Sequence, residues 1–310
     1  MTHTPPRPAP ADDSARAEIG VIGGTGFYAL LDDAREVRVE TPYGAPADAL
    51  TLGTVAGRQV AFLPRHGRGH STPPHRINYR ANLWALRSVG VRQVLAPCAV
   101  GSLCRELVPG TVVLPDQVVD RTSGRTGTFF DDVVEHVSFA DPYCAAGRAA
   151  VLKAAADRGE TVTDGATMVV VQGPRFSSRA ESQWYASAGW SLVNMTGLPE
   201  AALARELALC YTSLALVTDL DAGVAVGDGV SEEAVHRVFA THVARLRELV
   251  LTTVGELPAV RDCACGSAPE PARSLFAPGS PGAVQAASVE VRPEVRRPGG
   301  SRSQDGRKPS

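Results

Sequence analysis

The fold is decided first by Ile19-Gly20-Val21-Ile22-Gly23-Gly24-Thr25-Gly26, a short apolar run followed directly by a glycine-rich turn. An apolar run of this length, bounded by turn residues, is typical of a buried strand. Glycines allow backbone N–H groups to approach an oxyanion closely, and a threonine hydroxyl can donate one more hydrogen bond. The stretch therefore predicts a buried strand whose carboxyl end holds an anion such as phosphate, with a plain structural turn as the alternative.

Short apolar runs and helical patterns alternate along the rest of the chain. The runs that predict strands are Ile19–Gly23, Val60–Leu63, Gln93–Val100, Thr111–Val119, Thr167–Val171, Leu192–Met195 and Ser213–Thr218. The patterns that predict helices are Asn78–Ser88, Ala145–Asp157, Arg179–Ser187, Glu200–Leu209 and Glu232–Val254. This alternation predicts a single α/β domain with a central mixed, largely parallel sheet flanked by helices. In such folds ligands bind at the carboxyl ends of the strands.

The two ends of the chain differ in composition from its centre. Residues 1–17 carry four prolines, and residues 267–310 carry seven prolines with many Ser, Gly and Arg residues. We expect a disordered arm over 1–17, the folded domain over 18–265 and a disordered tail over 266–310, with a docking role for the tail as the alternative. The net charge of −2 and the pI near 6.4 argue against general binding to nucleic acid or to an anionic membrane.

The six cysteines and the start of the chain bear on the compartment. The cysteines are scattered, which favours free thiols over a disulfide framework. The first residues contain no apolar run typical of a signal peptide, and no stretch is long enough to span a bilayer, so we expect a cytoplasmic protein. Cys263-Ala264-Cys265 is a candidate metal or redox pair, but the sequence offers no second pair beside it, so no metal site is predicted.

Pro64-Arg65-His66-Gly67-Arg68-Gly69-His70 closes another predicted strand with a basic loop. Arginine matches phosphate geometry as a bidentate donor, and histidine adds a further contact. The glycines argue against a helix that would place two histidines on one face for zinc. A solvated loop without a role remains the alternative. A dinucleotide-binding turn is disfavoured at Gly23–Gly26, because the third glycine of GxGxxG would fall at Tyr28 or beyond.

The predicted strand Ser213–Thr218 leads into Asp219-Leu220-Asp221. Side chains two residues apart share one face of an extended chain, so both carboxylates can point at one ligand. Paired acids can bind Mg²⁺, transfer protons or accept N–H donors from a purine. Capping of a loop is the structural alternative.

These segments occur together in the order and spacing of one family. The matching motifs are Ile22–Gly26, Arg65–Arg68, Ala99–Leu103, Gln172–Glu181, Asn194–Thr196, Pro199-Glu200 and Thr218–Asp221. Over about residues 18–265 the sequence closely resembles the trimeric purine nucleoside phosphorylases, and within them the 5′-methylthioadenosine phosphorylases. The resemblance implies the nucleoside phosphorylase fold, a homotrimer, phosphate as co-substrate, and neither a cofactor nor a metal.

The resemblance also implies a role for individual residues. The expected phosphate ligands are Thr25, Arg65, His66, Ala99 and Thr196. The nucleoside would be bound by Met195 beneath the ribose, Phe176 and Ser177 around the purine, Asp219 at N7 as general acid with a pKa raised by burial, and Asp221 at the 6-amino group. Val235 and Val238 would line the 5′ pocket, together with His136 from the neighbouring subunit. Cys98 stands where many relatives have a hydroxyl or amide side chain, so its contact with the ligand is in doubt.

The implied reaction is phosphate-dependent cleavage of 5′-methylthioadenosine to adenine and 5-methylthioribose 1-phosphate. The nearest alternative is a phosphorylase for 6-oxopurine nucleosides such as inosine or methylthioinosine. Relatives with that preference commonly carry Asn at the position of Asp219, so the acid favours a 6-amino purine. A nucleoside-binding protein without catalysis and a nicotinamide dehydrogenase are more distant alternatives.

Overall fold

The computed structural model describes residues 16–24, 32–224, 229–267 and 291–292. Its strands are β1 (Ile19–Gly23), β2 (Asp32–Val37), β3 (Leu50–Val55), β4 (Arg58–Pro64), β5 (Gln93–Ser102), β6 (Val112–Leu114), β7 (Gln117–Arg121), β8 (Thr163–Asp164), β9 (Thr167–Val171), β10 (Leu192–Asn194), β11 (Cys210–Leu220) and β12 (Val291–Arg292). Its helices are α1 (Tyr79–Ser88), α2 (Ala145–Asp157), α3 (Arg179–Ser187), α4 (Gly197–Glu206) and α5 (Glu232–Glu256), with 3₁₀ turns η3 (Pro74–Arg76) and η4 (Ala264–Gly266). The expected arm and tail lie almost entirely outside the described residues.

The strands form one mixed sheet in the order β12-β2-β3-β4-β1-β5-β10-β9-β7. β1 is parallel to both β4 and β5, whereas β2, β3 and β4 pair in antiparallel fashion. The sheet branches at β5, because β11 also runs parallel to it along its whole length. The carboxyl ends of β1, β4, β5 and β11 therefore meet at one edge of the sheet. The predicted mixed sheet flanked by helices is confirmed.

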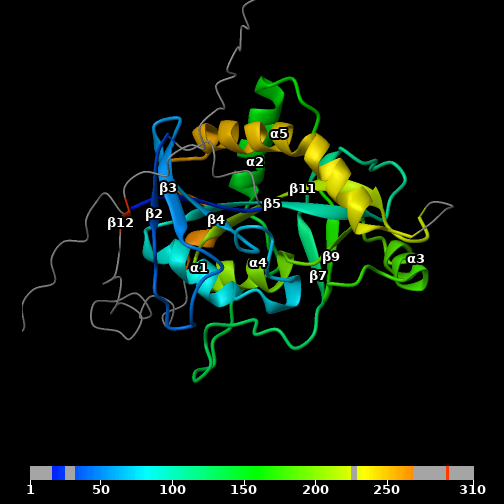
Figure 1. Cartoon of the computed structure of the whole chain (residues 1–310), viewed down its shortest axis with the longest axis horizontal. Helices are drawn as coiled ribbons and strands as arrows, with labels where there is room; N and C mark the ends of the chain where they lie inside the picture. The colour runs from blue at the N-terminus through cyan, green and yellow to red at the C-terminus, as the bar shows by residue number, and fades with distance from the viewer. Residues whose placement is uncertain (1–15, 25–31, 225–228, 268–290, 293–310) are drawn as a thin grey trace, which may run out of the picture.

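Helices cover the two faces of the sheet in separate layers. Figure 1 shows α2 and α5 on one face and α1 and α4 on the other. Each pair of helices packs on its own apolar cluster. Val151 of α2 and Leu249 of α5 belong to one cluster, and Leu83 of α1 and Leu203 of α4 belong to the other. α3 packs beside β9 and β10 through the buried ring of Tyr185. Among the helices in the described part of the chain, none is long and apolar enough to cross a membrane.

Several predicted elements differ from those observed. The run Thr111–Val119 is not one strand but two, β6 and β7, which pair with different partners. Pro115 lies between them and has no N–H to donate to a ladder. β2 was not predicted because its polar sequence lacks the apolar pattern of a strand, and β3 was missed although Leu50 and Leu52 alternate along it. α4 begins at Gly197 rather than Glu200, and Leu198 within it has non-helical backbone angles.

Gly147 sets how closely α2 packs on β11. A Cβ at this position would lie 2.0 Å from Thr212 Oγ1, closer than any real contact, whereas a Cβ on Gly255 in α5 would meet only Ala56 Cβ at 3.6 Å. We expect Gly147→Ala to lower the free energy of unfolding by about 1–3 kcal/mol through overpacking. Gly255→Ala, the matched helix control, should leave it unchanged or raise it by up to about 1 kcal/mol. Urea denaturation measures both, and equal effects of the two variants would contradict this packing account.

Candidate active site

A cavity of about 730 Å³ opens at the edge where the carboxyl ends of the strands meet. Most of the predicted site residues line it, namely Arg65, His66, Cys98, Ala99, Phe176, Ser177, Met195, Thr196, Asp219, Asp221 and Val235. Thr25 lies outside the described residues, although Gly24 before it lines the cavity. His136 is exposed on the segment 131–140 and does not line the cavity of its own chain. Residues far apart in the sequence are thus gathered as the predicted topology requires.

α5 forms one wall of the cavity with a regular helical stripe. The lining residues of α5 are Glu232, Val235, His236, Phe239 and Ala240, which follow the i, i+3, i+4, i+7, i+8 pattern of a single helix face. Val238 lies off this face and is not brought to the cavity, contrary to the expectation that it pairs with Val235. His236 and Phe239 were missed in the sequence, although the 3.6-residue period extended from Val235 would have identified Phe239.

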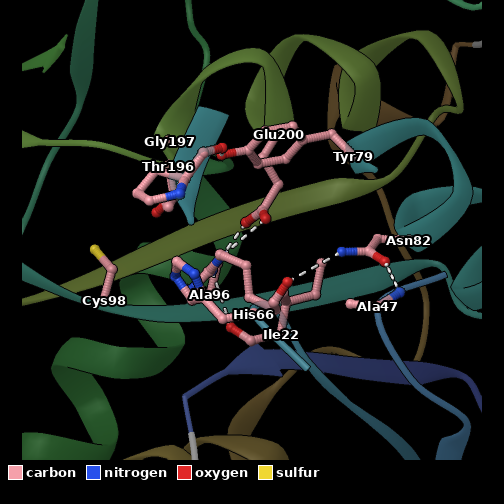
Figure 2. Close-up of polar contacts among 12 residues, drawn as sticks. Ile22, Ala47, His66, Tyr79, Asn82, Ala96, Cys98, Thr196, Gly197 and Glu200 are labelled. Carbon is pink, nitrogen blue, oxygen red and sulfur yellow. Dashed lines mark hydrogen bonds and ion pairs between the residues drawn. The ribbon is translucent and has the colours of Figure 1, made fainter. Parts of the chain in front are cut away.

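A buried ion pair fixes the floor of the site. Arg65 Nε and Nη2 donate to the two carboxylate oxygens of Glu200 at 2.8 and 2.9 Å. Both side chains are almost fully buried, at 4% and 1% exposed. Glu200 Oε1 also accepts from the Tyr211 hydroxyl at 2.7 Å. Figure 2 shows dashed contacts at the Glu200 carboxylate, with Thr196, Cys98 and His66 in the same view.

The remaining bonds of Arg65 limit what it can offer a ligand. Its Nη2 donates to the Ile22 carbonyl and its Nη1 to the Pro97 carbonyl, at 3.0 and 3.1 Å. A guanidinium has five N–H groups, so a single N–H, on Nη1, is left over. Burial lowers the pKa of Arg65, but the charge of Glu200 more than offsets this and the pKa is raised. The positive charge of Arg65 is therefore already balanced by Glu200. Its Nε and Nη2 groups are engaged, so it cannot bind an anion in bidentate fashion.

Arg68 does not join Arg65 at the cavity. Its side chain is half exposed and forms ion pairs with Glu36 and Asp48. The basic loop seen in the sequence is thus split between a buried arginine that lines the cavity and a surface arginine that does not. Among the described residues that line the cavity, Arg65 is the one arginine or lysine.

His66 enters the site as a neutral ring. Its Nδ1 lies 2.8 Å from the Thr72 carbonyl oxygen, so Nδ1 carries the proton and donates. Burial, with smaller contributions from Arg65 and His70, lowers the pKa of His66 to about 4. The ring stacks on His70 with centroids 4.0 Å apart. At neutral pH the other nitrogen, Nε2, is therefore a hydrogen-bond acceptor, suited to a ligand that carries its own proton.

Asn194 holds the strand end that carries Thr196. Its Oδ1 accepts from the backbone N–H groups of Thr196 and Gly197 at 2.7 and 2.6 Å, and its Nδ2 donates to the Ala99 carbonyl at 3.1 Å. This side chain ties two predicted anion ligands, Ala99 and Thr196, to one another at the start of α4. The Thr196 hydroxyl makes only a long contact of 3.4 Å to the same oxygen, so it is free to turn to a ligand.

Arg125 organises the loops beneath Met195 and was not found in the sequence. Its Nη1 donates to the carbonyls of Met195 and Leu198 at 2.9 and 2.6 Å, and its Nη2 donates to the Gln172 carbonyl at 2.6 Å. One of the two lone pairs of the Met195 carbonyl is thus used by Arg125. The Met195 side chain packs on Gly173, where a Cβ would come within 2.6 Å of its sulfur. A lone arginine in a loop has no local pattern that would reveal this role.

The two acids lie where β11 departs from regular pairing with β5. Val217 pairs with Val100 but Asp219 pairs with Gly101, so Thr218 forms a bulge. Gly101 allows the close approach, since a Cβ there would meet Asp219 Oδ1 at 3.0 Å and Asp221 Cβ at 3.3 Å. Both carboxylates line the cavity, as the Asp-x-Asp spacing predicts.

The two acids differ in their surroundings. Asp221 accepts from the Ser182 hydroxyl at 2.7 Å. Asp219 has one oxygen 2.8 Å from the Thr218 hydroxyl, while its Oδ1 is buried and has no partner in the described part of the chain. Burial, together with the charge of Asp221, raises the pKa of Asp219 to about 6 despite the hydrogen bond from Thr218. The expected rise is confirmed, and Asp219 can act as an acid near neutral pH.

The ion pair between Arg65 and Glu200 gives a direct stability prediction. Glu200→Gln leaves the guanidinium buried beside a neutral partner, so the free energy of unfolding should fall by about 3–5 kcal/mol. Asp157→Asn removes one partner of Lys153 on the surface, where both side chains are more than half exposed, and should cost at most about 1 kcal/mol. Guanidinium chloride titration of both variants measures the difference. A similar fall in the free energy of unfolding for both variants would show that the buried pair stabilises the fold no more than a surface pair.

Comparison with known proteins agrees with this arrangement. The family model described as the phosphorylase superfamily matches residues 18–255. The chain is 64% identical to a purine nucleoside phosphorylase of Streptomyces coelicolor, over 83% of this chain and 95% of that protein. It is 57% identical to an S-methyl-5′-thioadenosine phosphorylase of Mycolicibacterium smegmatis, over 79% and 93%. The solved structure of a methylthioadenosine phosphorylase from an Antarctic soil metagenomic library superimposes with a TM-score of 0.78 at 38% identity, over 83% of this chain and 95% of that one. The chain is a member of the phosphorylase superfamily.

Proposed function

We propose that this enzyme uses phosphate to cleave 5′-methylthioadenosine into adenine and 5-methylthioribose 1-phosphate. One observation carries the proposal. The cavity that contains Asp219 Oδ1 and Ser177 Oγ, which are buried without a hydrogen-bond partner among the described residues, also contains Arg65, His66 and Thr196. In the order β4-β1-β5-β11, the strand that ends just before Arg65 and the strand that carries Asp219 are three spacings apart, roughly 14 Å. That span suits a nucleoside that reaches from an anion at one side to a base at the other.

The phosphate would bind beside Arg65, His66, Ala99 and Thr196, together with the loop at Thr25. Arg65 contributes one N–H, and the neutral His66 contributes an acceptor at Nε2 for the proton of HPO₄²⁻. A neutral acceptor selects a phosphate that still carries a hydrogen, and that hydrogen is the one released when the ester forms. Phosphorylases use phosphate as co-substrate, and this chemistry fits that use.

The reaction follows from where charge develops. The bond from C1′ to N9 stretches first, which leaves cationic character on the ribose and the bonding electron pair on the purine. A phosphate oxygen then bonds to C1′, and Asp219 in its protonated form gives its proton to N7. The proton that phosphate loses on forming the ester balances the one that adenine gains. Preorganised charge and positioning supply most of the acceleration.

The purine wall favours a 6-amino base. Asp221 offers a carboxylate oxygen to an exocyclic amino group, which is a donor, whereas the O6 of a 6-oxopurine would face an acceptor. Phe176 provides an aromatic surface for the base, and Ser177 Oγ supplies a hydrogen-bonding group that has no partner in the part of the chain that the structure describes. Cys98 also lines the cavity, where burial raises the pKa of its thiol and keeps it neutral.

The wall formed by α5 supports an apolar 5′ substituent. Val235, Phe239 and Ala240 present apolar surface to the cavity, which suits a methylthio group better than a hydroxyl. The second candidate is a purine nucleoside phosphorylase that acts on 6-oxopurine nucleosides such as inosine or methylthioinosine. The name of the Streptomyces coelicolor relative favours it, as does His236, a polar group on the same helix face.

We further propose a homotrimer in which His136 reaches the 5′ pocket of a neighbouring subunit. The support is the surface beside it, where Val133 and Val134 are 53% and 86% exposed, although each is apolar. Sedimentation equilibrium should give the mass of three chains, and a monomer at assay concentration would contradict the proposal.

A substrate comparison tests the proposed function. Purified enzyme is supplied with phosphate and, in parallel, with 5′-methylthioadenosine, adenosine and inosine, and kcat/KM is measured for the release of each base. We expect 5′-methylthioadenosine to be cleaved most efficiently and only when phosphate is present. Faster release of hypoxanthine from inosine would favour the second candidate, and turnover without phosphate would refute phosphorolysis.

Asp219→Asn tests the acid. An amide cannot transfer the proton, so adenine release should fall by about 10²–10⁴-fold. With phosphate saturating, kcat/KM of the native enzyme should decline as pH rises above about 6, because the free carboxyl loses its proton there. The variant should lack this decline, and Asp157→Asn should keep it. Near-normal turnover of Asp219→Asn would eliminate the proposed role.

A further inference from the structure

Four of the six cysteines converge away from the cavity. Cys144 is the N-cap residue of α2, Cys210 is the first residue of β11, and Cys263 and Cys265 flank the start of η4. Their sulfur atoms all lie within 4.8 Å of one another. Three of the side chains are buried and Cys263 is half-buried. The cluster lies at the amino end of β11, whereas Asp219 lies near its carboxyl end.

The spacing of the sulfurs matches a tetrahedral metal site. Cys263 Sγ lies 3.8 Å from Cys144 Sγ and 3.3 Å from Cys210 Sγ. Four sulfurs placed about 2.3 Å from a central Zn²⁺ in a tetrahedron are separated by about 3.8 Å. A disulfide would require about 2.05 Å, well below both contacts. Both contacts, and the 4.8 Å within which all four sulfurs lie, are compatible with four thiolates around one ion.

The surroundings also suit negative charge on sulfur. Arg261 Nη1 lies 3.8 Å from Cys210 Sγ and is held there by a hydrogen bond of 2.8 Å to the Ala208 carbonyl. Cys144 lies at the N-terminus of α2, where the helix dipole favours an anion. Thiolates are the species that bind zinc.

We propose that Cys144, Cys210, Cys263 and Cys265 form a structural zinc site. All four positions of the tetrahedron are taken by protein, which leaves none for substrate and marks the site as structural. The ion would tie the segment after α5 to the start of α2 and to the amino end of β11, three elements that are distant in the chain. The proposal is independent of the reaction assigned to the cavity.

The sequence alone did not reveal this site. Cys263 and Cys265 form a recognisable pair, but their partners Cys144 and Cys210 stand alone, so no metal was predicted. The topology supplies the second pair, because Cys144 N–H donates to the Tyr211 carbonyl and this bond brings the start of α2 beside the start of β11.

Metal analysis of the untagged full-length protein, purified under reducing conditions without chelator, tests the proposal. We expect elemental mass spectrometry to find one zinc ion per chain. Titration of the thiols with a mercurial reagent should release all of this zinc. Cys210→Ser and Cys265→Ser should lose the zinc, whereas Cys104→Ser, which alters a cysteine outside the cluster, should keep it. A strong chelator should lower the melting temperature of the native protein and of Cys104→Ser.

The measurements on the native chain decide the matter even where a cluster variant fails to fold. Protein without bound zinc, or with iron in its place, would overturn the proposal. So would alkylation and mass analysis that find the four cysteines joined as disulfides, or a Cys104→Ser variant that loses zinc as the cluster variants do. Cobalt-substituted protein should show the intense visible absorption of tetrahedral thiolate coordination, and its absence would count against the site.

Discussion

The carboxyl edge of the sheet depends on the buried ion pair between Arg65 and Glu200. Two charges removed from water must satisfy each other, and here the bidentate contact does so while the remaining donors of Arg65 reach the carbonyls of Ile22 and Pro97. The pair thereby joins the ends of β1 and β4 and the middle of β5 to α4, and through the Tyr211 hydroxyl it also reaches β11. The cavity lies at this junction, with Arg65 in its lining.

This constraint also determines the chemistry that the site can perform. An arginine that is already paired offers one N–H and little net charge, and the adjacent His66 is neutral because burial lowers its pKa. Burial raises the pKa of Asp219, so that group also tends towards its neutral form at mildly acidic pH. In the described part of the cavity, the one cationic arginine is paired with Glu200, and the acidic side chains of Asp221 and Glu232 also line the wall. For the proposed reaction, we expect such a site to orient phosphate and purine and to stabilise charge as it develops in the transition state.

Much of the fold was predictable from local patterns, because apolar runs identified β1, β5, β9 and β11. Local patterns also pointed to Arg65, His66, Asp219 and Asp221, which line the cavity. Phe176, Ser177, Met195 and Thr196, which line it as well, were expected only from the resemblance to the family. Features that depend on tertiary contacts were not predictable. The role of Glu200 as the partner of Arg65, the carbonyl contacts of Arg125 and the bridging by Asn194 each join segments far apart in sequence. Val238 was placed by spacing alone, and the true face of α5 follows from how the helix packs. The cysteine cluster shows the same limit, since only the topology brings Cys144 and Cys210 to Cys263 and Cys265.

We expect phosphate to bind without breaking the pair between Arg65 and Glu200. A crystal structure of the enzyme with phosphate and adenine tests this expectation most directly. We predict that both contacts to Glu200 remain, that one phosphate oxygen accepts from Arg65 Nη1 beside His66 and Thr196, and that adenine N7 faces Asp219. Two results would contradict this expectation. The Arg65 guanidinium could leave Glu200 and bind phosphate in bidentate fashion, or phosphate could bind away from Arg65.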